Sequence, residues 1–145
     1  MEKKKNRLTD KIRIYALVLI SLLLMGFSYV EGIASWYGGV GWASWYSVES
    51  CKREETWQKY GGKTASGEVF DDRKFIFACW HLPFGTKVEF TNLRNGKKVI
   101  AICKDRGPAK QLVKKGRIFD LSKAAFQEIE DLDKGIVKVK WRIIK

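Results

Sequence analysis

Acidic residues beside glycines or at the ends of apolar runs are the groups in this chain best suited to chemistry. Three short stretches contain them, and the acids are Glu68, Asp71, Asp105 and Asp120. Cleavage of a glycosidic bond needs a carboxylic acid that protonates the leaving oxygen and a site that stabilises an oxocarbenium-like transition state. Carboxylates on loops held by a rigid scaffold meet the first need. The acid set therefore predicts sugar-cleaving chemistry.

Short motifs surround these acids in a fixed order. They are A-S-W-Y-G at 34–38, T-A-S-G-E at 64–68, L-P-F-G-T at 82–86, D-R-G-P at 105–108 and D-L-S-K-A-A at 120–125. From about Gly32 to the C-terminus, this series resembles the rare lipoprotein A family of septal peptidoglycan lytic transglycosylases. The resemblance implies a mainly β fold, a six-stranded double-psi β-barrel with one short helix. It also implies an endolytic lyase that acts on the glycan strands of peptidoglycan.

The reaction of that family assigns roles to the acids. A lytic transglycosylase uses the sugar's own 6-hydroxyl as the nucleophile and leaves a 1,6-anhydro-N-acetylmuramic acid end, so it needs one acid that can turn base. A carboxyl whose pKa is raised by apolar neighbours can serve. Through the resemblance, Glu68 is the first candidate, and Asp71 and Asp105 match the other acidic site residues. Expansins and related endoglucanases share the barrel and use an aspartate in a comparable motif, so Asp120 is a secondary candidate.

Each acid also has a plainer interpretation. Glu68 could be a solvated loop acid after a turn glycine, and Asp71, which another aspartate follows, could be a turn residue. Asp105 could be a turn aspartate neutralised by Arg106, and Asp120 could cap the helix that follows it. The residues alone leave these alternatives open.

One position departs from the family's pattern. The family has a histidine three residues before L-P-F-G-T, and that register places Cys79 there. His81 lies two residues further on, which is the same face of an extended strand, and is the other secondary catalytic candidate. Loss of the family histidine favours an alternative function, a non-catalytic, expansin-like module that binds cell-wall glycan.

Tryptophan is abundant, with 6 in 145 residues. Exposed aromatic rings stack on sugars, although most tryptophans of a small barrel belong to its core. We expect Trp80 to line the sugar groove and Arg106 to contact the substrate. Trp141 alternates with charged residues and is expected in the core.

Strand signals occupy the second half of the chain. Strands are predicted at 86–93 and 97–103, joined at Asn95-Gly96, a pair that favours a tight hairpin. The run 99–103 is apolar throughout, which predicts a strand covered on both sides. Strict alternation over 136–144 predicts the strand that closes the barrel.

One helix is predicted between these strands. Apolar residues recur at helical spacing over 122–132, and Gly135 is expected to end the helix. Upstream, the sequences at 32–38 and 41–47 repeat one aromatic pattern, and only one copy can be the first barrel strand. The charged segment at about 49–63 is interpreted as an insertion loop within a domain that spans 32–145.

Three cysteines, at 51, 79 and 103, permit one disulfide in an exported protein. Cys103 lies in an apolar run and is expected to be a buried thiol. Cys51 and Cys79 are therefore the predicted disulfide pair. A zinc site is not expected, because no Cys-x-x-Cys occurs and the chain has one histidine. No metal or other cofactor is predicted.

The first 28 residues are predicted to be a signal peptide or a retained anchor. Six Lys and Arg precede the apolar run 14–27, which is short for a membrane span of roughly 20 residues. In both cases the domain would be exported to the periplasm or cell envelope, and the membrane would be contacted only through an uncleaved leader. No cysteine follows the run directly, so a lipoprotein anchor is not expected.

The formal charge is +12, and from Glu31 onward 22 Lys and Arg against 14 Asp and Glu leave +8. A basic exported domain could meet anionic wall polymers or acidic lipids. Nucleic-acid motifs are absent, and export argues against that partner. The expected partner is the peptidoglycan glycan strand, bound by a monomer. Much of the lysine alternates along strands, as on a solvated face.

Overall fold

The computed structural model describes residues 38–144. The predicted leader at 1–28 and most of the first aromatic copy at 32–38 lie outside this part. The elements, in chain order, are β1 (Gly38–Tyr46), α2 (Val48–Arg53), α3 (Thr56–Lys59), β2 (Ile76–Ala78), β3 (Lys87–Asn92), β4 (Lys98–Asp105), α4 (Lys110–Val113), β5 (Arg117–Ser122), α5 (Lys123–Ile129), the 3₁₀ turn η1 (Leu132–Lys134) and β6 (Ile136–Ile144). None of the helices in the described part is long and apolar enough to cross a membrane.

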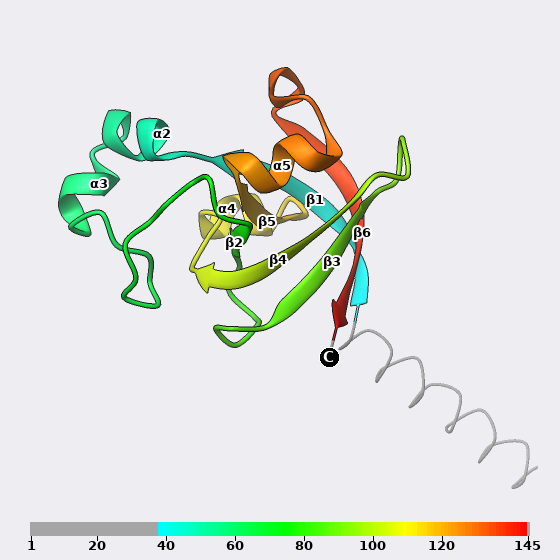
Figure 1. Cartoon of the computed structure of the whole chain (residues 1–145), viewed down its shortest axis with the longest axis horizontal. Coiled ribbons are helices and arrows are strands. Elements are labelled where there is room, and N and C mark those ends of the chain that lie inside the picture. Colours follow the sequence, from blue (N-terminus) through cyan, green and yellow to red (C-terminus); the bar gives the residue numbers. More distant parts are fainter. Residues whose placement is uncertain (1–37, 145) are drawn as a thin grey trace, which may run out of the picture. The chain divides into compact units, whose positions relative to one another are not determined.

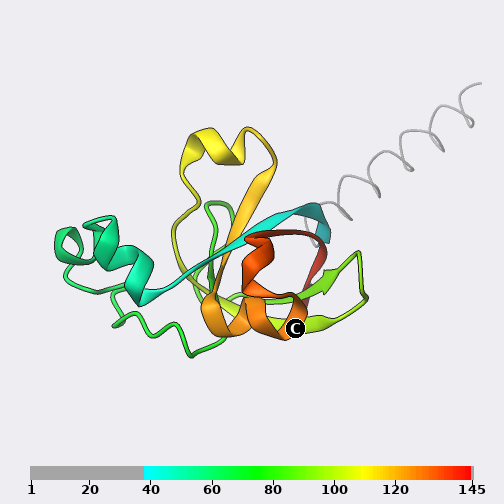
Figure 2. The same cartoon turned by 90° about the horizontal axis from the view of Figure 1, so that it is seen from above.

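The six strands close into a barrel in the order β1-β5-β2-β4-β3-β6 (Figures 1 and 2). The β1–β5 and β2–β4 pairs are parallel, and the other neighbours are antiparallel. The predicted mainly β, six-stranded barrel is therefore confirmed. The hairpin between β3 and β4 and the closing strand β6 also lie where the sequence predicted them.

The first barrel strand is built from the second aromatic copy. Residues 41–46 lie within β1, which pairs with β6 on one side and with β5 on the other. This pairing decides between the two copies, which are too alike for the sequence to separate. β1 thereby brings Ser44 and Tyr46 beside the end of β5, where Asp120 lies.

Edge-to-face aromatic rings from four strands fill the barrel. The Phe119 ring centroid lies 5.7 Å from that of Phe77, 5.0 Å from that of Phe90 and 5.4 Å from that of Trp141. The interplanar angles of 72–79° are the geometry that aromatic quadrupoles favour. Phe77, Phe90 and Phe119 have no exposed surface. Trp141 belongs to this core, as predicted.

The strand over 99–103 is not covered on both sides. Val99, Ala101 and Cys103 face the interior, whereas Ile100 is 49% exposed. A closed barrel has a single wall, so each strand has one inner and one outer face, and the outer face here carries apolar side chains. The prediction that this strand is covered on both sides was therefore wrong.

Helix α5 is shorter than the predicted 122–132. Ser122 caps it by accepting from the Ala125 N–H at 3.4 Å, and the helix ends at Ile129 because Glu130 is extended. Gly135, with φ +66°, ends η1 and not α5. Asp120 lies two residues before the cap, so its interpretation as the helix N-cap was also wrong.

Glu130 leaves the helix to join a buried polar cluster. Its carboxylate accepts from the Arg94 guanidinium at 2.7 Å and from the Asn92 amide at 3.0 Å. The Arg94 hydrogen bonds lower the pKa of Glu130 to about 2, from an ordinary value of 4.5. These partners come from the β3–β4 hairpin, which explains why spacing alone placed the helix end too late.

This depressed pKa gives a pH-dependent contribution to stability. Because folding favours the carboxylate, its contribution should be complete above pH 4.5 and should disappear as the pH falls toward 2. Glu130→Gln is therefore expected to lower the free energy of unfolding at pH 7, with a deficit that shrinks between pH 4.5 and 2. Urea titrations across this range would measure it. Glu128→Gln, an exposed change on the same helix, should show no such trend. A deficit that does not vary with pH would contradict the assignment.

The segment at 49–63, predicted as an insertion loop, contains the two short helices α2 and α3, which project to one side of the barrel (Figure 1). Ser47 caps α2 in a reciprocal arrangement with Ser50. The Val48 N–H donates to the Asp72 carboxylate at 3.0 Å, which ties the start of the segment to the chain that follows it.

The predicted Cys51–Cys79 disulfide is absent, and all three cysteines are free. Cys79 and Cys103 have no exposed surface, whereas Cys51 is partly exposed on α2. Cys79 directs its sulfur into the barrel, where it meets Cys103 and not Cys51. The prediction failed because sequence did not show that Cys79 faces inward. Cys103 is buried, as expected.

Candidate active site

Two of the predicted acids lie in one row across four adjacent strands. Ser44 on β1 is opposite Asp120 on β5, Asp120 is opposite Ala78 on β2, and Ala78 is opposite Asp105 on β4. Neighbouring strands are roughly 4.8 Å apart, so the Cα atoms of the two aspartates are about 10 Å apart. The small Ala78 side chain lies between them, on the face opposite the core residue Phe77.

A β-bulge aims Asp105 into this row. Two consecutive residues of β2 pair with Cys103 and Asp105, so Lys104 is an extra residue in β4. In a regular strand, residues 103 and 105 would point to the same face. The extra residue reverses the alternation, so Cys103 faces the core while Asp105 faces the row.

A second bulge acts on the other aspartate. Two consecutive residues of β1 pair with Arg117 and Phe119, so Ile118 is the extra residue of β5. Arg117 and Asp120 therefore share a face, and the Arg117 guanidinium donates to Asp120 Oδ1 at 2.8 and 3.2 Å. The Ser44 hydroxyl also donates to that oxygen. Asp120 is thus held by one cation and one hydroxyl.

Asp105 is fixed through one carboxylate oxygen. Oδ1 accepts from the Ala65 N–H at 2.9 Å and from the Arg106 N–H at 2.8 Å. Oδ2 has the Tyr46 hydroxyl at 3.4 Å. Burial raises the pKa of Asp105 above its ordinary 3.8, even though these hydrogen bonds act in the opposite direction. The site therefore holds a positioned carboxyl with an increased tendency to keep its proton.

The aromatic ring of Tyr46 forms an apolar wall beside Asp105. Its ring stacks on Phe70 with centroids 4.5 Å apart and an interplanar angle of 3°. Burial, and then the nearby Asp105 and Asp120 charges, raise the pKa of Tyr46 well above 10. The phenol therefore remains a neutral hydrogen-bond donor to Asp105.

The T-A-S-G-E motif lies against the end of β4. The Ala65 N–H binds Asp105, and the Ser66 N–H donates to the Lys104 carbonyl at 3.1 Å. Glu68 pairs with the Lys104 ammonium, and its side chain is 55% exposed. The loop thus brings Glu68 next to the residue before Asp105, at the edge of the row.

Asp71 is not brought to Asp105 by any contact in the described part of the chain. Its carboxylate forms a bidentate pair with Arg73, at 2.9 and 3.0 Å, and accepts the Arg73 N–H at 3.1 Å. These hydrogen bonds lower the pKa of Asp71 to about 2. The geometry is that of a turn aspartate.

The other predicted site residues are engaged elsewhere. The His81 ring lies 5.8 Å from Phe119 and 5.9 Å from Trp141, and burial lowers its pKa. Trp80 is 46% exposed, its indole N–H donates to the Pro108 carbonyl at 2.6 Å, and Lys110 lies over its ring.

Arg106 has a supporting position. Its guanidinium donates to the carbonyls of Cys79 at 2.9 Å and Leu82 at 3.0 Å, and it stacks on Phe84 at 3.8 Å. These contacts join the L-P-F-G-T and D-R-G-P motifs beneath Asp105.

Three residues of the site were missed by sequence reasoning: Ser44, Tyr46 and Arg117. Ser44 and Tyr46 belong to the aromatic repeat, where the signal was present but could not be assigned to one copy. Nothing in the sequence indicated Arg117, because residues three positions apart in a regular strand point to opposite faces, and Arg117 would then lie on the face opposite Asp120.

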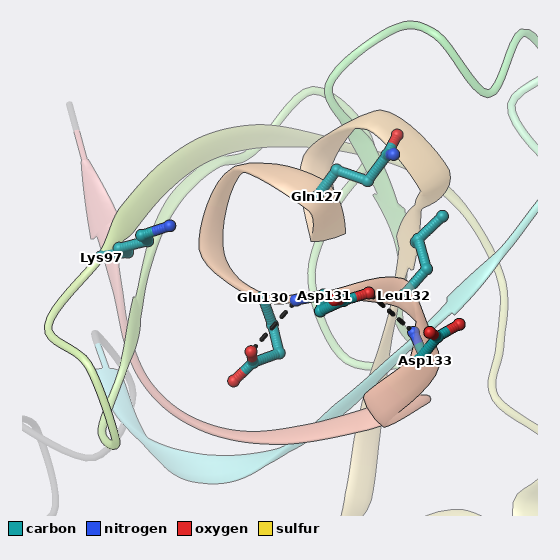
Figure 3. A pocket seen from close by; sticks show the side chains of 6 residues that line it. All are labelled: Lys97, Gln127, Glu130, Asp131, Leu132 and Asp133. Atoms are coloured by element: carbon teal, nitrogen blue, oxygen red, sulfur yellow. Dashed lines mark hydrogen bonds between the residues drawn. The ribbon is translucent and has the colours of Figure 1, made fainter.

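A separate pocket of about 460 Å³ lies near the end of α5 (Figure 3). Its lining residues are Lys97, Gln127, Glu130, Asp131, Leu132 and Asp133. The carboxylates of Glu130 and Asp131 accept hydrogen bonds from backbone N–H groups of the same turn. The Asp131 N–H donates to Glu130 and the Asp133 N–H donates to Asp131, at 3.1 Å each (Figure 3). Within residues 38–144, no three His, Cys, Asp or Glu side chains are placed to hold a metal ion.

The closed barrel with two parallel strand pairs is a double-psi β-barrel. Two solved structures have a similar fold. The Streptomyces papain inhibitor has a TM-score of 0.55 and 22% identity, covering 74% of this chain and 94% of that one. The apo expansin of Clavibacter michiganensis has a TM-score of 0.50 and 18% identity, covering 74% and 50%. At these identities the likeness shows the fold alone.

Residues 29–141 match the family described as "Lytic transglycolase", and the chain belongs to that family. It is 35% identical over 117 residues to the probable endolytic peptidoglycan transglycosylase RlpA of Aquifex aeolicus, and 42% identical over 100 residues to the RlpA of Treponema pallidum. These matches cover 81% and 68% of this chain but only 42% and 27% of the relatives, so the chain spans less than half of their length.

Proposed function

We propose that this domain is an exported endolytic lytic transglycosylase that cleaves peptidoglycan glycan strands and leaves 1,6-anhydro-N-acetylmuramic acid ends. Membership of the lytic transglycolase family and the names of its relatives support the reaction class. The observation that carries the proposal is Asp105, a half-buried carboxyl with a raised pKa and one oxygen fixed by two backbone N–H groups. A carboxyl whose pKa is raised by burial can serve as the proton donor.

In the proposed reaction, Asp105 acts first as acid and then as base. The proton on Asp105 Oδ2 passes to the glycosidic oxygen as the bond from that oxygen to the sugar's C1 breaks. The 6-hydroxyl of the same sugar then forms a bond to C1, and its proton returns to Asp105. The carboxyl is regenerated, and no water is consumed. The fixed Oδ1 keeps Oδ2 oriented throughout, which is what proton transfer within hydrogen-bond reach requires.

We assign supporting roles to the other acids. Asp120, held in place by Arg117 and Ser44, keeps a carboxylate across Ala78 from Asp105, where it can stabilise positive charge at C1. Glu68, at the exposed edge beside Lys104, is placed to accept hydrogen bonds from sugar hydroxyls. Asp71 is assigned no step because Arg73 occupies both of its carboxylate oxygens.

The direct test is digestion of purified sacculi with the domain, followed by mass spectrometry of the products. The proposal predicts muropeptides with 1,6-anhydro ends. Reducing ends would indicate a hydrolase instead. Retention on insoluble peptidoglycan with no product would support a glycan-binding module, the alternative that follows from Cys79 replacing the family histidine.

Tyr46→Phe should shift the pH dependence of this activity. The hydroxyl donates to Asp105 and thereby opposes the rise of the Asp105 pKa, so its removal should raise that pKa further. The decline in rate at high pH is then expected to move to higher pH, while the ring still stacks on Phe70. Rates of anhydro-muropeptide release across pH would measure this. Tyr60→Phe, at an exposed tyrosine, is the matched control. If both variants keep the wild-type profile, Tyr46 does not tune Asp105.

A further inference from the structure

Two thiols meet inside the barrel, and the proposed reaction does not use them. The Sγ atoms of Cys79 and Cys103 are 3.7 Å apart, and neither residue has exposed surface. We propose that Cys79 and Cys103 form an oxidation site that reacts with a small peroxide and closes to an intramolecular disulfide. This inference is independent of the proposed enzymatic function.

The backbone holds the two sulfurs together although 24 positions separate them in the sequence. Cys103 is the last inward-facing residue of β4 before its bulge, and it pairs with Phe77 of the parallel strand β2. Cys79 follows β2 directly, and its N–H donates to the Asp105 carbonyl at 3.2 Å. Cys103 is thus held by the strand pairing before the bulge, and Cys79 is held by its hydrogen bond to Asp105 after the bulge.

The surroundings favour a thiolate, which distinguishes the pair from ordinary buried cysteines. Hydrogen bonding from the Cys103 S–H lowers the pKa of Cys79, against the effect of burial. The Arg106 guanidinium lies 3.6 Å from Cys103 Sγ and adds a positive charge beside the pair. The hydrogen bond to Cys79, and then burial, raise the pKa of Cys103, so the proton of the pair stays on Cys103. Cys79 is therefore the attacking thiolate, and Cys103 is the resolving thiol.

The chemistry proceeds in two steps with hydrogen peroxide as the oxidant. The Cys79 thiolate attacks one peroxide oxygen and the O–O bond breaks. The leaving hydroxide takes the proton that the Cys79 thiol gave up, so the products are a sulfenic acid on Cys79 and one water. The Cys103 sulfur then attacks the Cys79 sulfur, the S–O bond breaks, and a second water leaves with the Cys103 proton. Two thiols lose two electrons in total, and the peroxide gains them.

Closing the bond brings the sulfurs from 3.7 Å to about 2 Å. The bond would link the end of β2 to β4 below the Asp105 turn. Because the cross-link removes conformations from the unfolded chain, the oxidised protein should unfold at a temperature several degrees higher than the reduced one.

Peptide mapping of the full chain after hydrogen peroxide treatment tests the inference. Trypsin places Cys79 in peptide 75–87, Cys103 in peptide 99–104 and Cys51 in a third peptide. The expected product is peptide 75–87 joined to peptide 99–104, two hydrogens lighter than the reduced pair and separated again by a dithiol reductant. The melting temperature should rise with the cross-linked fraction.

Variants separate the roles of the two thiols. Cys103→Ser should leave a sulfenic acid on Cys79 that dimedone traps when it is added with urea after the peroxide is removed, whereas Cys51→Ser should cross-link like the wild-type chain. The wild-type map decides the matter even where a variant fails to fold. Oxidation confined to Cys51, or a 79–103 bond that forms only in denaturant, would overturn the proposal.

Discussion

Asp105→Asn is expected to reduce the release of 1,6-anhydro muropeptides by about 10²- to 10⁴-fold, the range for loss of a general acid–base group. The asparagine oxygen can still accept from the Ala65 and Arg106 N–H groups, so the turn should keep its position. The amide cannot deliver a proton. Quantitative mass spectrometry of digested sacculi measures the loss, and binding to insoluble peptidoglycan should persist.

The same variant has a predicted signature in stability. Burial raises the pKa of Asp105, so the folded protein binds this proton more tightly than the unfolded chain does. That contribution to stability is complete below pH 3.8 and is lost as the pH rises through the folded pKa. Asp105→Asn should therefore compare better with the wild-type protein in unfolding free energy at neutral pH than it does at pH 3. Asp133→Asn, on the surface turn η1, is the control for both measurements. Full activity in Asp105→Asn would exclude the proposed acid.

Phe119→Ala is expected to produce the largest loss of stability, about 3–5 kcal/mol, as measured by urea unfolding. Phe119 has no exposed surface and contacts the rings of Phe77, Phe90 and Trp141. Its removal leaves a cavity where four strands meet, and the surrounding rings cannot collapse without moving those strands.

A small domain could fail to fold after such a loss, so Phe119→Leu provides a folded variant with an intermediate expected cost. Phe75→Ala is the matched control, because Phe75 is 43% exposed and should cost less than about 1 kcal/mol. Equal costs at positions 75 and 119 would show that the barrel interior is not the main source of stability.

Much of the fold could be predicted from local patterns. The alternation of β6 follows directly from a strand with one face toward the core, and Val137, Val139 and Trp141 are indeed buried. Asn95-Gly96 marked the hairpin because glycine adopts the positive φ of 74° found at Gly96. These features depend on neighbours along the chain, so sequence contains the information.

Features that depend on distant partners were predicted less well. Arg94 and Asn92 draw Glu130 out of the helix, and no spacing within 122–132 reveals them. The disulfide prediction failed similarly, because Cys79 meets Cys103 through the pairing of two strands that the β3 hairpin separates in sequence. Each error arose where a long-range contact overrode a local preference.

The sequence by itself determined the family and the barrel, because short motifs in a fixed order specify these, and it predicted Glu68, Asp71, Asp105 and Asp120 as candidate acids. Only the tertiary structure decided which acids share a face. Strand alternation would send Asp105 to the core beside Cys103 and would separate Arg117 from Asp120. The extra residues Lys104 and Ile118 reverse the alternation of their strands, so Asp105 points away from the core and Arg117 lies on the same face as Asp120. Whether a residue is extra depends on the partner strand's register, so the bulges become visible only once the strands have paired.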